Sequence, residues 1–286
     1  MKKRWARRHI VEAFFKILML ISFVLVAGSL TLILWTIVSK GLPALSWAMV
    51  TQKPNGGYYL GKTGGILNAI LGSLYMAGGG TLLALLLGLP IALYLETYLG
   101  DMAWSRYVRL ALDVLWGIPS IVYGAFGFLL MLAIGMRASM LGGIIALTLL
   151  ELPILTRGMD EVIRMMPQDL EQAALALGST RLEVALRVVT RQMLPGIVTA
   201  VLLAFGRGIG DAASVLFTAG YTDRLPTSLL RPAASLPLAV YFQLSMPYPE
   251  VQKRAYAAAL ILTLIVLAVS LGSRWLAGRL NRNVIR

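Results

Sequence analysis

The chain has 286 residues, of which 58% are hydrophobic and 14% are charged. A soluble domain has roughly 25% charged residues, so this composition excludes a water-soluble globular protein and indicates an integral membrane protein. The chain has no Cys and one His, His9, which excludes disulfides and a Cys/His zinc site, so no metal is expected. The net charge is +13, but the Lys and Arg residues cluster beside apolar segments rather than on one binding face. Nucleic acid is therefore not an expected partner.

Six apolar stretches are long enough to cross a bilayer, whose ~30 Å hydrocarbon core needs about 20 residues of helix. They cover residues 17–38, 68–95, 110–134, 140–156, 196–219 and 256–276. The sequence therefore predicts an all-α membrane protein with six transmembrane helices. The basic start followed by an apolar run also fits a signal peptide. That run is longer than the ~7–15 residues of a signal-peptide core, so we interpret it as an uncleaved first helix.

Six helices place both termini on one side of the membrane. If that side is the cytoplasm, it receives about twice as many Lys and Arg residues as the outside, which is the bias expected of a membrane protein. We therefore predict a multi-pass protein of the cytoplasmic (inner) membrane with cytoplasmic N- and C-termini. Pro119 interrupts the third helix and removes a backbone hydrogen bond. A packing kink and a break against a cavity both fit this interruption.

One external loop contains a nucleotide-site pattern. Residues 56–63 match the phosphate-loop pattern G-x-x-x-x-G-K-T. No predicted strand precedes them, and the topology places them on the side away from ATP. We therefore interpret this stretch as a surface loop.

Residues 158–195 form the longest polar stretch between predicted helices. Pro167 suits the first position of a helix, and Gly178 suits its end. The apolar positions between them, with helical spacing, are Leu170, Ala173, Ala174 and Leu177. Thr180 and Glu183 fit a capping box that starts a second helix, whose apolar positions are Leu182, Ala185, Leu186, Val189 and Met193. The pattern predicts two helices joined by a glycine turn. They dock on a partner, lie on the membrane surface, or pack on the protein's own bundle.

The fifth predicted helix contains Arg207, roughly 16 Å from its start at 1.5 Å per residue. A charge at this depth is costly and usually faces a cavity or a partner. At 100° per residue, Asp211, Ser214 and Thr218 lie within about 40° of Arg207, which predicts one polar stripe. The stripe is either an i, i+4 ion pair that locks helices or a pathway in which the guanidinium binds an anion. Glu151 is a second candidate partner for Arg207.

Four stretches resemble the permeases of binding-protein-dependent ABC importers. They are Gln172-Ala173-Ala174-x-x-x-Gly178, Gly64 to Ser73, Ile118 to Gly124, and Arg207 to Ala219. The first is similar to the EAA loop, which docks on the ATPase subunit. The similarity extends from about residue 10 to residue 280 and is strongest to phosphate permeases of the PstA type. The chain departs from the family pattern at several positions. Gln172, beside Glu171, and Asp211 stand where the family has Glu, Ala212 stands where Thr is common, and Thr190-Arg191 replaces the usual Leu-Pro.

The resemblance implies the type I ABC importer permease fold. Residues 1–66 are then a cytoplasmic tail, the first helix and an external loop, 67–277 the permease core with its cytoplasmic coupling segment 158–195, and 278–286 a basic tail. The chain is expected to move inorganic phosphate by alternating access without catalytic residues or a cofactor of its own, because ATP and Mg²⁺ bind the partner ATPase. Expected partners are a sister permease in a heterodimer, an ATPase homodimer, an external phosphate-binding protein and membrane lipid.

The same resemblance suggests two sets of functional residues. The substrate pathway is expected to contain Arg207, Asp211, Ser214 and Thr218. ATPase coupling is expected to involve Glu171, Gln172, Ala173, Ala174 and Gly178. Three alternatives remain open: a permease for another oxyanion such as sulfate or molybdate, a proton-coupled secondary transporter, and a membrane scaffold that transports nothing.

Overall fold

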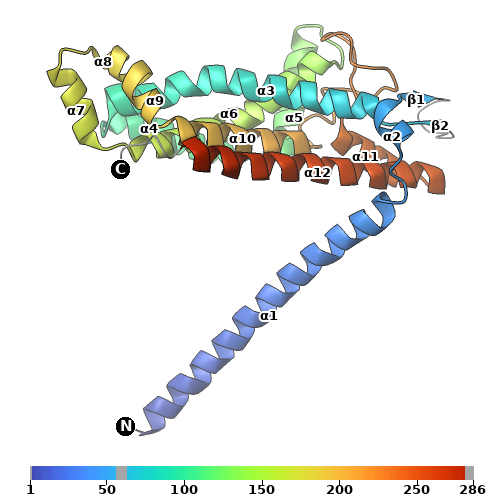
Figure 1. The fold of residues 1–286 in the computed structure, drawn as a ribbon, viewed down its shortest axis with the longest axis horizontal. Helices are drawn as coiled ribbons and strands as arrows, with labels where there is room; N and C mark the ends of the chain where they lie inside the picture. The colour runs from blue at the N-terminus through green and yellow to red at the C-terminus, as the bar shows by residue number, and fades with distance from the viewer. Residues whose placement is uncertain (1, 56–62, 281–286) are drawn as a thin grey trace.

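The structure is a computed structural model that describes residues 2–55 and 63–280. Figure 1 shows an elongated helical bundle, from which a long first helix, α1, runs away at an angle. The main helices are α1 (Lys2–Gly41), α3 (Leu67–Tyr94), α4 (Ala103–Trp116), α5 (Ser120–Ala133), α6 (Met140–Arg164), α10 (Leu194–Gly210), α11 (Leu236–Leu244) and α12 (Pro249–Leu280).

Shorter elements lie at the two ends of the bundle. One end holds the π-helical η1 (Leu95–Leu99) together with α7 (Gln168–Ala176), α8 (Arg181–Glu183), η2 (Val184–Val189) and α9 (Thr190–Gln192). The opposite end holds α2 (Trp47–Thr51) and the antiparallel strands β1 (Pro54–Asn55) and β2 (Thr63–Gly64). We call these the α7 end and the loop end. Most of the nucleotide-site pattern, residues 56–62, falls outside the described residues.

Among the described residues, four helices are long and apolar enough to cross a membrane: Val11–Gly41, Leu67–Leu99, Met140–Arg164 and Pro249–Arg279. Two further pairs pass the same test together but are sharply bent. The break before Ser120 turns α4 and α5 by 98°, and a second break turns Arg181–Gln192 and α10 by 74°. Counted as one span each, the bent pairs bring the total to six, the predicted number, although the second pair includes Arg181–Gln192 from the segment predicted to be cytoplasmic. The interruption at Pro119 is therefore nearly a right-angle bend rather than a small kink.

Small residues allow α3 and α6 to pack closely along most of their lengths. A Cβ at Gly80 of α3 would lie 2.9 Å from Leu147 Cβ of α6, and one at Gly88 would lie 2.5 Å from Thr156 Oγ1. Glycine at such positions lets membrane helices approach by backbone contact, where dispersion forces provide the association energy. α3 and α6 therefore form the rigid centre of the bundle.

The predicted helix 196–219 is wrong in its second half. α10 ends at Gly210, Asp211 adopts φ −83° and ψ 120°, and the chain is irregular until α11 begins at Leu236. Neighbouring segments bond to this irregular stretch. Thr218 O accepts the N–H of Ser139 at 2.9 Å, and Leu236 donates its N–H to Ser73 Oγ at 2.7 Å. These tertiary contacts replace the helical ones, which is why continuous hydrophobicity did not signal the break.

The first testable consequence concerns the contact of α3 with residues 233–236. A Cβ at Gly72 would overlap the backbone oxygen of Ala234, which no rotamer change can relieve. We expect Gly72→Ala to destabilise the fold by about 1–3 kcal/mol through overpacking. Thermal unfolding of the detergent-purified protein measures this.

The matched control lies on the same helix. A Cβ at Gly78 would have no other atom within 4 Å, so Gly78→Ala adds helix propensity without a clash. It should leave the unfolding temperature unchanged or raise it. Equal destabilisation by both substitutions would contradict the contact described for Gly72.

Candidate functional site

Arg207 lies in the last turn of α10 and its side chain is exposed. Within residues 2–55 and 63–280, no ion pair or hydrogen bond engages its guanidinium. Gly208, the next residue, faces α6, and no atom lies within 4 Å of the Cβ position of Gly210. Arg207 therefore lies on a face of α10 that the described residues leave uncovered.

The other members of the predicted stripe point elsewhere, because the helix ends before them. The Asp211 carboxylate accepts the N–H of Ser214 at 2.8 Å and so caps the turn formed by residues 213–219. Ser214 and Thr218 are fully buried, and the Thr218 hydroxyl donates to Ser214 O at 3.1 Å. The structure thus groups Asp211, Ser214 and Thr218 with one another, but the predicted common face with Arg207 is wrong. The i, i+4 ion pair of Arg207 with Asp211 is not formed.

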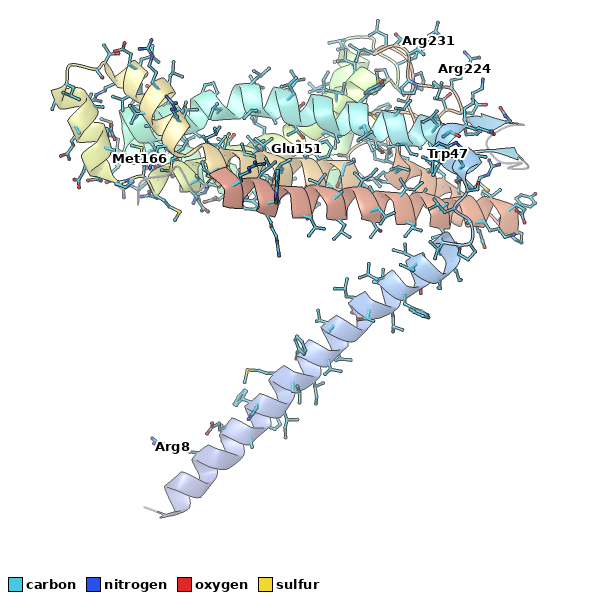
Figure 2. All side chains as sticks on the ribbon, in the orientation of Figure 1. Arg8, Trp47, Glu151, Met166, Arg224 and Arg231 are labelled. Atoms are coloured by element: carbon cyan, nitrogen blue, oxygen red, sulfur yellow. The ribbon has the colours of Figure 1, made fainter. Side chains whose placement is uncertain are left out.

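Glu151 occupies the interior of the bundle, near the middle of its length (Figure 2). Its Oε2 accepts the hydroxyl hydrogen of Thr81 at 2.6 Å, whereas Oε1 has no hydrogen-bond partner among the described residues. Oε1 lies against the backbone of Gly208, where any Cβ would overlap it. Glu151 therefore joins α3, α6 and α10 one residue from Arg207, without forming an ion pair with that arginine.

The predicted pair of helices is present at the α7 end, and its turn and cap are formed by residues close together in the sequence. Gly178, with φ +89°, ends α7 in a left-handed conformation that glycine adopts without strain. Gly178 N–H donates to Leu175 O at 3.0 Å and Ser179 N–H donates to Ala174 O at 3.2 Å, which completes a Schellman motif. The capping box of Thr180 and Glu183 is also confirmed, with both of its hydrogen bonds formed.

The burial of apolar side chains at the α7 end differs from the burial that their helical spacing predicted. Ala174 is partly buried against a cluster that includes Met159 and Val184, whereas Leu177 is 88% exposed. Leu182 and Leu186 are exposed as well, although the pattern placed them with Ala185 and Val189. The wider π-helical turn of η2 separates those residues onto different faces. The α7 end therefore presents uncovered apolar side chains to its surroundings.

The candidate coupling residues divide between an inner and an outer position. Glu171 is half-buried, while Gln172, Ala173 and Gly178 are exposed. A cavity of about 430 Å³ lies between α7 and the bundle, and its lining includes Glu96, Arg164, Glu171, Gln172 and Leu175. The inner wall of this cavity is a group of charged side chains from η1 and α6.

Sequence reasoning missed a cluster of charged side chains that includes Glu96 of this wall. Arg109 of α4 is 7% exposed, and it binds Asp160 of α6 through Nε at 2.9 Å and Nη2 at 3.1 Å. Arg109 also forms an ion pair with Glu96, and Arg157 joins Asp113 to Asp160 at 2.8 Å each. We call Glu96, Arg109, Asp113, Arg157 and Asp160 the ionic cluster.

A signal for the cluster is present in the sequence. Arg109 and Asp113 are spaced i, i+4, and Arg157 and Asp160 are spaced i, i+3, so each pair lies on one helix face. The positive-inside rule accounts for these arginines as residues of the cytoplasmic side and makes no prediction about their ion-pair partners. Among the described residues, no group of three or more His, Cys, Asp or Glu is arranged to hold a metal ion.

Residues 85–286 match the family described as "Binding-protein-dependent transport system inner membrane component". This match covers most of the chain, including α6, the α7 end and α10. The chain belongs to this family. It is therefore a membrane subunit of an ABC transporter, a transport component and not the enzyme of that system.

Relatives of similar length support the assignment. The chain is 36% identical over 251 residues to "Phosphate transport system permease protein PstA" of Haemophilus influenzae, covering 85% of each protein. It is 33% identical over 290 residues to "Phosphate transport system permease protein PstA 1" of Mycobacterium tuberculosis, covering 96% of this chain and 91% of that protein.

Solved structures show the same fold. The permease resembles a chain of the MetNI methionine ABC transporter in an inward-facing conformation, with a TM-score of 0.63 and 18% identity over 75% of this chain and 95% of that one. It also resembles a chain of a bacterial ABC transporter that imports alginate, with a TM-score of 0.51 and 14% identity over 90% of this chain and 96% of that one. The predicted type I importer fold is confirmed.

The contact of Glu151 with Gly208 gives the second prediction. In Gly208→Ala the new methyl group would displace the carboxyl group and push α10 away from α6. We expect a loss of about 1–3 kcal/mol in the stability of the purified permease. Gly206→Ala is the control on the same helix, because its Cβ would lie 4.0 Å from Val269 Cγ1.

A double-mutant cycle isolates the contact. Glu151→Ala removes the group that the methyl would strike, so Gly208→Ala should be harmless in the Glu151→Ala background. Strictly additive effects of the two substitutions on the unfolding temperature would show that the packing of Glu151 on Gly208 is not the cause.

Proposed function

We propose that this permease imports inorganic phosphate. The observation that carries the proposal is Arg207, whose guanidinium has no partner among the described residues although its helix α10 belongs to a bent pair apolar enough to cross a membrane. Such a group requires a counter-charge from outside the chain, and its planar fork of donors suits the oxygens of a phosphate. The two PstA relatives, both named for phosphate transport, support phosphate over other oxyanions.

The proposed assembly follows from what the chain leaves uncovered. We infer a heterodimer with a sister permease, which covers the exposed face of α10 and places Arg207 at the pathway between the two subunits. Asp211 lies one turn further along and limits how tightly an anion is held, while the buried Ser214 and Thr218 support the turn that Asp211 caps. Glu151 fixes the position of α10 from the other side.

The α7 end is the proposed docking site of a cytoplasmic ATPase homodimer, which binds ATP and Mg²⁺. The exposed Gln172, Ala173 and Leu177 and the turn at Gly178 form the contact surface, backed by Ala174. Glu171 is half-buried against the bundle, so we assign the contact with the ATPase to Gln172. The loop end faces outward and receives a phosphate-binding protein. Both chain termini are then cytoplasmic, in the inner membrane.

Two of the three alternatives are weaker on physical grounds. A secondary transporter or an inert scaffold has no use for an exposed, doubly capped helix turn at the α7 end, and the chain belongs to an ABC importer family. A permease for sulfate or molybdate would present similar chemistry at Arg207, so that alternative is decided by competition during uptake.

Replacing Arg207 tests the proposed pathway. In proteoliposomes that contain the permease with its sister subunit, ATPase and binding protein, we expect Arg207→Ala to lower ATP-driven uptake of labelled phosphate at least about tenfold. Arg207→Lys retains the charge without the planar fork, so its phosphate uptake should lie between that of the wild type and that of Arg207→Ala.

Two controls complete this experiment. Arg224→Ala removes an exposed arginine at the loop end (Figure 2) and should leave uptake unchanged. An excess of sulfate or molybdate should not inhibit the wild-type complex. Full uptake by an assembled Arg207→Ala complex would refute the pathway role, and strong inhibition by sulfate would refute the substrate.

Replacing Gly178 tests the proposed docking site. A β-branched residue is strained at φ +89°, so Gly178→Val should unwind the end of α7 and weaken copurification of the ATPase. Gly178→Asn is the matched control, because Asn tolerates the left-handed conformation. Equal ATPase retention by both variants would show that this turn does not position the docking surface.

A further inference from the structure

All three guanidinium nitrogens of Arg109 form contacts, and two of them bind residues of other helices. Nε and Nη2 bind the two carboxylate oxygens of Asp160, Nη2 also pairs with Glu96, and Nη1 donates to Ser105 Oγ at 3.2 Å. Asp160 is fully buried. A bidentate arginine-carboxylate pair fixes orientation as well as distance, so α4 cannot rotate or slide on α6 without breaking it.

The partners of Arg109 belong to the two elements that adjoin α7, namely α6 and η1. Asp160 lies in the last two turns of α6, which leads directly into α7, and Glu96 lies in η1 on the wall of the 430 Å³ cavity beneath α7. Arg157 repeats the link one turn away by joining Asp113 of α4 to Asp160. The ionic cluster thus ties α4 to the base of the coupling segment at two points.

The opposite face of α4 has no such attachment within the described chain. Trp104, Tyr107 and Val114 are 72%, 65% and 61% exposed. α4 packs mainly on α6, through the face that bears Arg109, Leu112 and Ser105. The position of α4 therefore depends on this one face, where the ionic cluster lies beside the buried Leu112.

Beyond the 98° bend, α5 lies directly on the turn that follows Arg207. A Cβ at Gly124 would come 2.7 Å from Ala213 O and 2.8 Å from Ser214 O, and one at Gly127 would come 3.4 Å from Thr218 Cγ2. The backbones are in contact without intervening side chains. A movement of α5 must therefore displace the turn of residues 213–219.

We propose that Arg109 is a positioning residue that makes α4 and α5 follow the coupling segment, so that the broken helix delivers the motion of α7 to the turn after Arg207. This inference rests on the proposed ATPase docking at α7. The ionic cluster is the joint between the docking end and the broken helix, and Lys cannot replace Arg109 because an ammonium lacks the bidentate fork.

The test compares ATP hydrolysis with phosphate uptake in the reconstituted complex. Arg109→Lys should hydrolyse ATP within about twofold of wild type but import about tenfold less phosphate per ATP. Arg106→Lys is the matched control, an exposed arginine on the same helix, and should change neither quantity. A purely structural role would lower complex yield and both activities together, and an unchanged uptake per ATP would overturn the proposal.

A distance measurement tests whether the ionic cluster links α5 to the coupling segment, and its readout does not depend on which substrate is transported. Spin labels at the exposed Leu129 of α5 and Leu267 of α12 should change their separation when ATP and vanadate are added to the wild-type complex, but not to the Arg109→Lys complex. The same change in both complexes would overturn the inference. If the wild-type complex imports no phosphate, the proposed substrate fails while this measurement still decides the role of Arg109.

A second variant guards against misassembly. Glu96→Gln removes one charge of the ionic cluster and leaves the bidentate pair of Arg109 with Asp160 intact. It should lower uptake per ATP by a smaller factor than Arg109→Lys. If Arg109→Lys does not assemble and Glu96→Gln shows wild-type uptake per ATP, the proposal is overturned.

Discussion

Backbone hydrogen bonding in a medium without water is the constraint on which the rest of this structure depends. The chain leaves the helical conformation at Gly210 and regains it at Leu236, so this stretch satisfies only part of its backbone polar groups internally, for example through the N–H of Ala219 on Val215 O. Neighbouring elements do so instead: Thr218 O and Arg231 O accept N–H groups at the start of α6, and the Ser73 hydroxyl accepts the N–H of Leu236. Such irregular backbone is stable inside a membrane protein when other protein segments enclose it. The close approach of α3 at Gly72 is the steric condition for that enclosure.

Within this frame the polar side chains have distinct tasks. Glu151 positions α10 internally through Thr81 and Gly208, so Arg207 on the neighbouring position is turned away from the interior. Arg109 performs the corresponding task for α4 at the α7 end, but through a bidentate ion pair. Both are buried polar residues whose role is to fix one helix relative to another. Arg207 differs because its group remains available to something outside the chain.

The parts that could be predicted from the sequence are those determined by local chemistry. The left-handed turn at Gly178 and the capping box at Thr180 need no information beyond a few neighbouring residues, and the family motif lies there too. The end of α10 could not be predicted, because residues 211–219 remain as apolar as a helix and the break is stabilised by Ser139 and α5, far away in the sequence. The ionic cluster was missed for the same reason, since Arg109 and Asp160 are separated by 51 residues.

The wide separation of α1 from the bundle has a consequence for biosynthesis. α1 has no buried residue over the most apolar part of its span and touches the bundle at its last turn, where Lys40 bonds to Tyr256 of α12, 216 residues later. At about 5–20 residues per second, translation needs ~10–40 s to produce that contact after α1 has emerged. During this interval the contact of Lys40 with Tyr256 cannot form, because α12 has not yet been synthesised. The first helix of the described chain can thus attach to α12 only after the helices between them have been made.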